Sequence, residues 1–190
     1  MLYRLLRTIA IGSTLLLASV TGGAHHETTQ LIIDADIFSV VDDTAALFLA
    51  STLPNVNLLA VNVHTQSSAL AVSAIAGHHG HTGVPVGLLR PITNDSFFDD
   101  WLYERREYAS KVAYHYSNGS LPWGNATDAW DPVALYRKTL AAQKDGSVTI
   151  ASVGFFDNLS GLLNSTADAY SRLPGPALIA AKVSKLVIMV

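Results

Sequence analysis

Four carboxylate side chains stand close together near the start of the chain, in a pattern that could bind a cation. Asp34 and Asp36 follow the apolar run 31–33, and Asp42 and Asp43 lie at the start of a helical pattern. Like charges gathered in one place repel one another unless a cation or a helix N-terminus compensates them. An oxygen-preferring ion such as Ca²⁺ is the natural partner. The alternative is that the first two are turn residues and the second two cap the helix, but a cap needs only one side chain.

Short apolar runs that alternate with helical patterns predict the elements that place these carboxylates. Strands are expected at 31–33, 57–63, 84–88, 148–153 and 185–190, and helices at 44–53, 69–77, about 99–116, 132–142, 158–163 and 177–181. Continuous apolar strands between helices predict an α/β fold, with a mostly parallel sheet and helices on both faces. The carboxylates then lie at the carboxyl edge of the strands, where ligands bind in such sheets.

The composition favours a small-molecule partner. The 190 residues are 49% hydrophobic, which suits one domain with a sizeable core. Only 14% of the residues are charged and the net charge is −3, so no basic surface for a nucleic acid polymer is expected. The absence of cysteine excludes disulfides and thiolate metal sites. His78, His79 and His81 cluster at a helix end, but they lack the pattern of a tetrahedral zinc site.

The first residues have the anatomy of a secretory signal. Arg4 and Arg7 precede the apolar stretch 9–20, and small residues lead to a plausible cleavage point after Ala24. We therefore expect a signal peptide at 1–24, a mature domain at 25–190, secretion to the extracellular space and no stable membrane association after cleavage. The alternative is an uncleaved membrane anchor, because the stretch is near the lower length limit for spanning a bilayer.

Five Asn-X-Ser/Thr triplets fit a secreted protein. They begin at Asn94, Asn118, Asn125, Asn158 and Asn164. Asn118 and Asn125 stand in a loop rich in Gly, Pro and Trp, so they are the best candidates for glycosylation. The sequence does not decide between a monomer and a homo-oligomer.

The acidic motif resembles that of the inosine/uridine-preferring nucleoside hydrolase family. In that family a strand ending in Asp-X-Asp is followed by Asp-Asp at the start of a helix, as in 34–36 and 42–47. The resemblance continues through 58–63, 83–87, 149–159 and 182–189, and the loop 37–41 is similar to that of secreted fungal members. The haloacid-dehalogenase phosphatases share the Asp-X-Asp but give no reason for the second pair.

The resemblance implies hydrolysis of the N-glycosidic bond of ribonucleosides, giving free base and ribose through a calcium-bound water. Asp36 would be a calcium ligand and the catalytic base, and Asp43 a second ligand. Val153 would give its backbone carbonyl to the ion. Asp42 would bind the ribose hydroxyls.

Two further residues have supporting roles in this interpretation. Asp34 would support the cluster from behind, and Asn158 would be a buried structural residue; the segment 64–68 should face the sugar. The family's remaining ligands lie beyond the equivalent of Val190, so the chain is expected to be the N-terminal half, incomplete at its C-terminus. Two alternatives stay open: a catalytically inactive fragment that binds calcium or ribosides, and an Asp-X-Asp phosphatase.

Overall fold

The protein is built around a five-stranded parallel sheet. A computed structural model describes residues 28–37, 41–92, 108–116 and 126–189. The strand order is β3-β2-β1-β4-β5, and every pairing is parallel. The strands are β1 (Thr29–Asp34), β2 (Val56–Val63), β3 (Val86–Leu88), β4 (Val148–Ser152) and β5 (Val183–Ile188). The predicted α/β fold is thus confirmed.

The chain changes direction across the sheet beside its central strand. From β1 it moves outward through β2 to β3, and it then returns to the other side of β1 to form β4 and β5. In an open parallel sheet, the crevice at such a switch point lies between the carboxyl ends of the two strands and is the usual ligand site. Here that point lies between β1 and β4, directly after Asp34 and Ser152, which are paired in the ladder.

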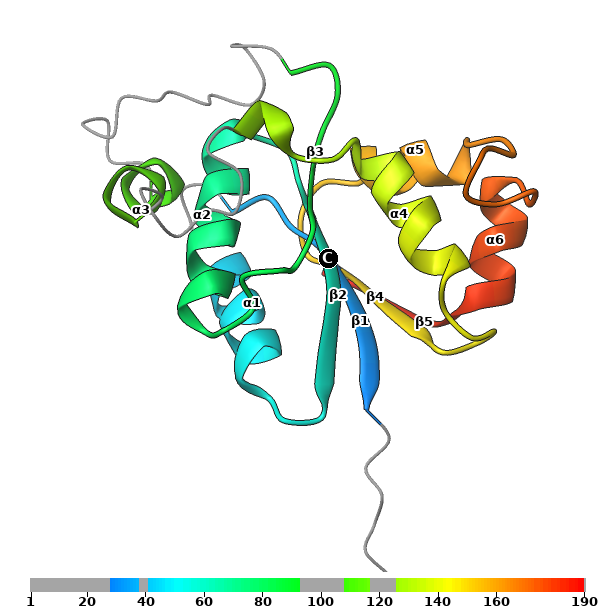
Figure 1. The fold of residues 1–190 in the computed structure, drawn as a ribbon, viewed down its shortest axis with the longest axis horizontal. Coiled ribbons are helices and arrows are strands. Elements are labelled where there is room, and N and C mark those ends of the chain that lie inside the picture. The colour runs from blue at the N-terminus through cyan, green and yellow to red at the C-terminus, as the bar shows by residue number, and fades with distance from the viewer. Residues whose placement is uncertain (1–27, 38–40, 93–107, 117–125, 190) are drawn as a thin grey trace, which may run out of the picture.

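Helices cover both faces of the sheet. Figure 1 shows α1, α2 and α3 on one side and α4, α5 and α6 on the other. Their bounds are α1 Asp42–Thr52, α2 Gln66–His78, α3 Tyr108–Tyr116, α4 Pro132–Ala141, α5 Asp157–Leu163 and α6 Gly175–Lys182, with a short 3-10 turn at Ala126–Asp128. Because successive strand residues point to opposite faces, Ile33 packs into the core under α1 and α2 while Ile32 packs into the core under α4, α5 and α6.

Local sequence signals explain where the helices begin. Thr65 caps α2, with its side chain accepting a hydrogen bond from the Ser68 amide. Asp131 caps α4 in the same way, and Pro132 occupies the first helical position, where its missing N–H costs nothing. Gly146 leads into β4 with φ of 60°, a conformation that favours glycine.

The observed bounds differ from the expected ones by a few residues at the ends. Apart from α3, the largest difference is at α2, which begins at Gln66, three residues before the expected start. Of the helix expected near 99–116, α3 accounts for the described part. The expected signal at 1–24 and the sequons at Asn94, Asn118 and Asn125 lie outside the described residues. Within the described ranges no helix has the length and apolar character needed to cross a membrane.

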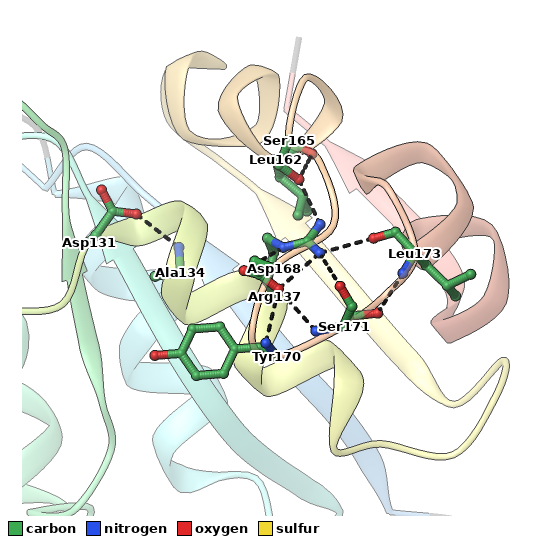
Figure 2. Close-up of polar contacts among 9 residues, drawn as sticks. All are labelled: Asp131, Ala134, Arg137, Leu162, Ser165, Asp168, Tyr170, Ser171 and Leu173. Atoms are coloured by element: carbon green, nitrogen blue, oxygen red, sulfur yellow. Dashed lines mark hydrogen bonds and ion pairs between the residues drawn. The ribbon is translucent and has the colours of Figure 1, made fainter.

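A buried arginine fixes the connection between α5 and α6. Arg137 on α4 is 2% exposed, and its guanidinium lies 2.8 Å and 3.0 Å from the two carboxylate oxygens of Asp168. It also donates to the Ser165 hydroxyl and to the carbonyls of Ser171 and Leu173 (Figure 2). The guanidinium lowers the pKa of Asp168 below its usual value, chiefly by this hydrogen bonding. The network ties the 165–173 loop to the helix that also reaches the candidate site.

We expect Arg137→Ala to lower the free energy of unfolding by about 2–3 kcal/mol, because it removes a buried guanidinium together with the hydrogen bonds that it gives to the 165–173 loop. Urea denaturation at neutral pH measures this. The matched control is Asp145→Ala, which removes the exposed ion pair with Lys182 and should cost no more than about 1 kcal/mol. Equal losses of unfolding free energy in the two variants would contradict the stabilising role of Arg137.

Candidate functional site

Asp34 closes β1 and is completely buried. One carboxylate oxygen accepts from the Tyr136 hydroxyl at 2.8 Å and the other from the Asn158 amide at 3.1 Å. Burial raises the pKa of Asp34 to about 7 despite both hydrogen bonds, and the charges of Asp157 and Asp36 add to the rise. With both oxygens bonded and no exposed surface, Asp34 is placed to support its neighbours rather than to contact a ligand.

Asp36 and Asp43 bring two carboxyl groups face to face across the loop between β1 and α1. Asp36 is partly exposed, while Asp43 in the first turn of α1 is 1% exposed. Burial is the main cause that raises the pKa of Asp43 to about 8, followed by the adjacent carboxyl group of Asp36 and the charge of Asp42. Neither Asp43 oxygen accepts a hydrogen bond of ordinary geometry from a described residue, although the nearby Asp36 amide lowers the pKa in part. A buried carboxylate in this state needs a proton or a cation.

The capping explanation of the second acidic pair is wrong. The N-cap of α1 is Val41, and no side chain makes the capping hydrogen bond. Asp42 is the first residue of the helix and is exposed, so its carboxylate is accessible to a ligand at the rim.

Val153 and Gly154 bring the end of β4 against the end of β1. The amides of both residues donate to the Asp34 carbonyl, at 2.8 Å and 3.2 Å. A Cβ added at Gly154 would lie 2.5 Å from the Asp36 nitrogen and 2.7 Å from the Ala35 carbonyl carbon. Only glycine therefore allows this approach, which sets Val153 beside the acidic pair.

The segment after β2 closes the site from the other side. His64 is 2% exposed, and its Nδ1 lies 3.2 Å from the Ala35 carbonyl. The Ser68 hydroxyl donates to the Ile37 carbonyl. Burial lowers the pKa of His64. The sequence predicted that 64–68 belongs to the site but not which atoms it contacts.

Sequence analysis missed Tyr136. It lies on the inner face of α4, where Leu135 and Leu140 also point into the core, so it resembles an ordinary apolar position. A hydroxyl on a buried helix face requires a partner, which was the available signal. Asn158, by contrast, is completely buried as expected, and its amide also reaches the Val63 carbonyl at 3.3 Å.

The donors present fit a hard cation. Among the described residues no group of three or more His, Cys, Asp or Glu side chains is arranged to hold a metal ion, and this includes His78, His79 and His81. The expected calcium set is different, since it consists of two carboxylates and one backbone carbonyl. The unpaired, buried oxygens of Asp43 beside Asp36 have the chemistry that such an ion requires.

Comparison with known proteins agrees with this geometry at the level of the fold. No protein-family model and no curated protein matches the chain. It is similar to the crystal structure of an inosine-uridine preferring nucleoside hydrolase from Bacillus anthracis, with a TM-score of 0.60 and 20% identity. It is also similar to a plant nucleoside hydrolase, the PpNRh1 enzyme, with a TM-score of 0.52 and 18% identity. The chain shares the nucleoside hydrolase fold.

The match covers most of this chain and about half of each neighbour. It includes 85% of the chain in both cases, against 50% of the bacterial protein and 47% of the plant protein. The chain therefore spans about half the length of the solved structures that it matches.

The raised pKa of Asp34 predicts that this residue destabilises the metal-free protein as pH rises. The unfolded chain loses the proton near 3.8, whereas the folded chain keeps it to about 7. Between these values the unfolded state binds fewer protons, so the free energy of unfolding falls with rising pH. Relative to Asp34→Asn, which cannot ionise, the wild type should lose roughly 3 kcal/mol from pH 4 to pH 7. Urea titrations in EDTA test this; a constant difference would contradict it.

Gly154→Ala should lower the free energy of unfolding by about 1–3 kcal/mol, because the added methyl group overlaps backbone atoms that cannot move independently. Thermal and urea unfolding measure the loss. Gly83→Ala is the control, since a Cβ there meets nothing within 4 Å, and it should change stability by less than about 0.5 kcal/mol. If Gly154→Ala changed stability as little as Gly83→Ala, the close approach of Gly154 to the backbone of residues 35 and 36 would be contradicted.

Proposed function

We propose that this chain carries the acidic half of a calcium-dependent nucleoside N-ribohydrolase site, which releases free base and ribose from ribonucleosides. The observation that supports this most directly is the Asp36–Asp43 pair. The buried oxygens of Asp43 lie beside the partly exposed Asp36 at the switch point of a sheet with the nucleoside hydrolase fold. Because the similarity to solved structures establishes the fold alone, the activity rests on the chemistry of these residues.

Asp36 acts as the general base in this proposal. It is the partly exposed member of the pair, so its carboxylate can reach a water that the buried Asp43 cannot. Proton removal from that water generates the nucleophile that attacks the anomeric carbon, as in inverting glycosidases. The electron pair of the N-glycosidic bond leaves with the nucleobase. The transition state resembles an oxocarbenium ion.

The other residues bind the ribose and the ion and hold the strand end in place. Asp42, exposed at the first turn of α1, accepts hydrogen bonds from ribose hydroxyls. Asp43 and the Val153 carbonyl, together with Asp36, would hold the ion. Calcium bound there would supply positive charge that favours deprotonation of the attacking water and binding of the sugar hydroxyls. Asp34, fixed by Tyr136, keeps the end of β1 in place.

The proposal includes the setting inferred from the sequence. The protein is secreted after loss of residues 1–24 and is glycosylated at Asn118 or Asn125. Its substrate is a free nucleoside rather than a polymer, because the net charge of −3 gives no attraction to a polyanion.

A second candidate is binding without turnover. The Asp36–Asp43 pair can ligate an ion, but among the described residues no group of three or more His, Cys, Asp or Glu side chains is arranged to hold a metal ion. Such a protein would bind calcium or ribosides but would not cleave them. A phosphatase is disfavoured, because its nucleophile would be Asp34, whose oxygens are both hydrogen-bonded and completely buried.

The test is whether the purified chain releases the nucleobase from inosine and uridine in the presence of calcium. A calcium concentration of about 1–5 mM is suitable, because it is about ten times the dissociation constant of a weak calcium site. We expect hydrolysis to be lost in EDTA and restored by calcium. Asp36→Ala should reduce kcat by about 10²–10⁴-fold, because it removes both the base and a ligand.

The control for that experiment is Asp145→Asn, which changes an exposed carboxylate on the turn before β4 and should leave the rate unchanged. Calcium-dependent stabilisation without base release at high protein concentration would favour the binding candidate. Magnesium-dependent cleavage of p-nitrophenyl phosphate would overturn the proposal in favour of a phosphatase.

A further inference from the structure

The two peptide carbonyls that flank Asp36 are both held by side chains of one segment, which links β2 to α2. The carbonyl of Ala35, just before Asp36, lies 3.2 Å from Nδ1 of His64. The carbonyl of Ile37, just after it, accepts from the Ser68 hydroxyl. Both interactions join residues about thirty positions apart in the sequence and are buried. The backbone on either side of the proposed base is therefore fixed by the residue that follows β2 and by the first turn of α2, rather than by its own loop.

The contact of His64 determines its tautomer. A carbonyl oxygen can only accept, so Nδ1 must carry the proton that it donates to Ala35. The ring is held in this orientation by burial and by an edge-to-face contact with Phe155, whose centroid is 5.6 Å away. Burial also favours the neutral form, against the charges of Asp157 and Asp36. The backbone carbonyls of Ala35 and Phe155 also oppose the lowering of the His64 pKa.

The contact of Ser68 belongs to a chain of hydroxyl groups. Because the Ser68 hydroxyl gives its one proton to the Ile37 carbonyl, the Thr65 hydroxyl must donate to Ser68, at 2.5 Å. Thr65 in turn accepts from the Ser68 backbone amide, at 3.2 Å, which is the cap of α2. The helix start and the loop of Asp36 are thus connected by hydrogen bonds whose directions are all determined.

Two other contacts complete the frame around Asp36. The Ala35 amide donates to the Asn62 carbonyl at 2.9 Å, and Gly154 packs against the Asp36 nitrogen from the side of β4. Groups that orient a metal ligand or a base commonly change metal affinity or activity about 10–100-fold when they are removed, although they never touch the ion.

We propose that His64 and Ser68 are positioning residues for Asp36, which act by fixing the Ala35 carbonyl directly before it and the Ile37 carbonyl one residue after it. This inference rests on the proposed function, since it takes Asp36 as the ligand and base. It assigns to the 64–68 segment a role in holding the acidic loop, in addition to any contact with sugar. Neither residue transfers a proton or contacts the reacting atoms.

The experiment compares variants that remove each contact with variants that keep it. Ser68→Ala removes the hydroxyl donor but leaves the backbone amide that makes the helix cap, and Ser68→Thr keeps the hydroxyl. His64→Leu removes the donor, and His64→Asn offers an amide N–H near the position of Nδ1. The control is Ser73→Ala, because Ser73 is similarly buried but lies five residues further along α2.

Three readouts are measured on the full chain: calcium affinity by titration calorimetry, kcat and KM for nucleoside hydrolysis, and NMR shifts and amide exchange of residues 35–37. We expect Ser68→Ala and His64→Leu to weaken calcium binding about tenfold or more. They should lower kcat more than they raise KM. Ser68→Thr and His64→Asn should recover most of the loss, and Ser73→Ala should match the wild type in all three measurements.

The outcomes separate this inference from the proposed function. Wild-type affinity and kcat in Ser68→Ala and His64→Leu would overturn the positioning role even if the chain cleaves nucleosides. Weakened calcium binding in these variants, with no hydrolysis by any form, would support positioning while the proposed function fails. If the wild type binds no calcium, the NMR data decide: unchanged signals at 35–37 in both variants overturn the inference, and faster exchange with shifted signals supports it.

Discussion

The structure depends on the burial of two carboxyl groups, Asp34 and Asp43, at the carboxyl edge of one parallel sheet. Burial raises the pKa of both, but their surroundings differ. Asp34 has a hydrogen-bond donor at each oxygen, supplied by helices on one face of the sheet, whereas Asp43 accepts no hydrogen bond of ordinary geometry from a described residue. The first is therefore a satisfied structural group, and the second is a group whose charge requires compensation from a ligand. Within one acidic motif, Asp34 therefore has a structural role, whereas Asp43 is placed to bind a ligand.

The α4 helix connects the stability of the fold to this edge. Two consecutive residues on it have separate tasks: Tyr136 donates to Asp34, and Arg137 anchors the loop between α5 and α6. That loop follows α5, which carries Asn158 to the second oxygen of Asp34. On the opposite side of the sheet, the segment at the start of α2 holds the loop of Asp36. Each layer of helices thus fixes one part of the acidic motif, and α5 also adds the charge of Asp157 near Asp34.

The similarity to known structures concerns the fold of the chain and not its individual side chains. The shared fold covers 85% of this chain, although only about a fifth of the residues are identical. A sheet topology constrains where strand ends meet, so a switch point can be retained while most side chains change. What the neighbours bind is a property of those proteins. The function proposed for this chain depends instead on the buried oxygens of its own Asp43.

Strand and helix periodicity and the Asp-X-Asp…Asp-Asp spacing are local properties, so the order and type of the elements and the positions of the acidic residues could be predicted from the sequence. The family resemblance also indicated that Asn158 is buried. Which carboxylates have hydrogen-bond donors could be seen only in the folded chain, since Tyr136 lies 102 residues from Asp34 and Asn158 lies 124 residues from it. Likewise, no local pattern could show that His64 and Ser68 reach the carbonyls beside Asp36. Hydrogen bonding and burial depend on which distant groups the sheet brings together, and that information is absent from the spacing of residues along the chain.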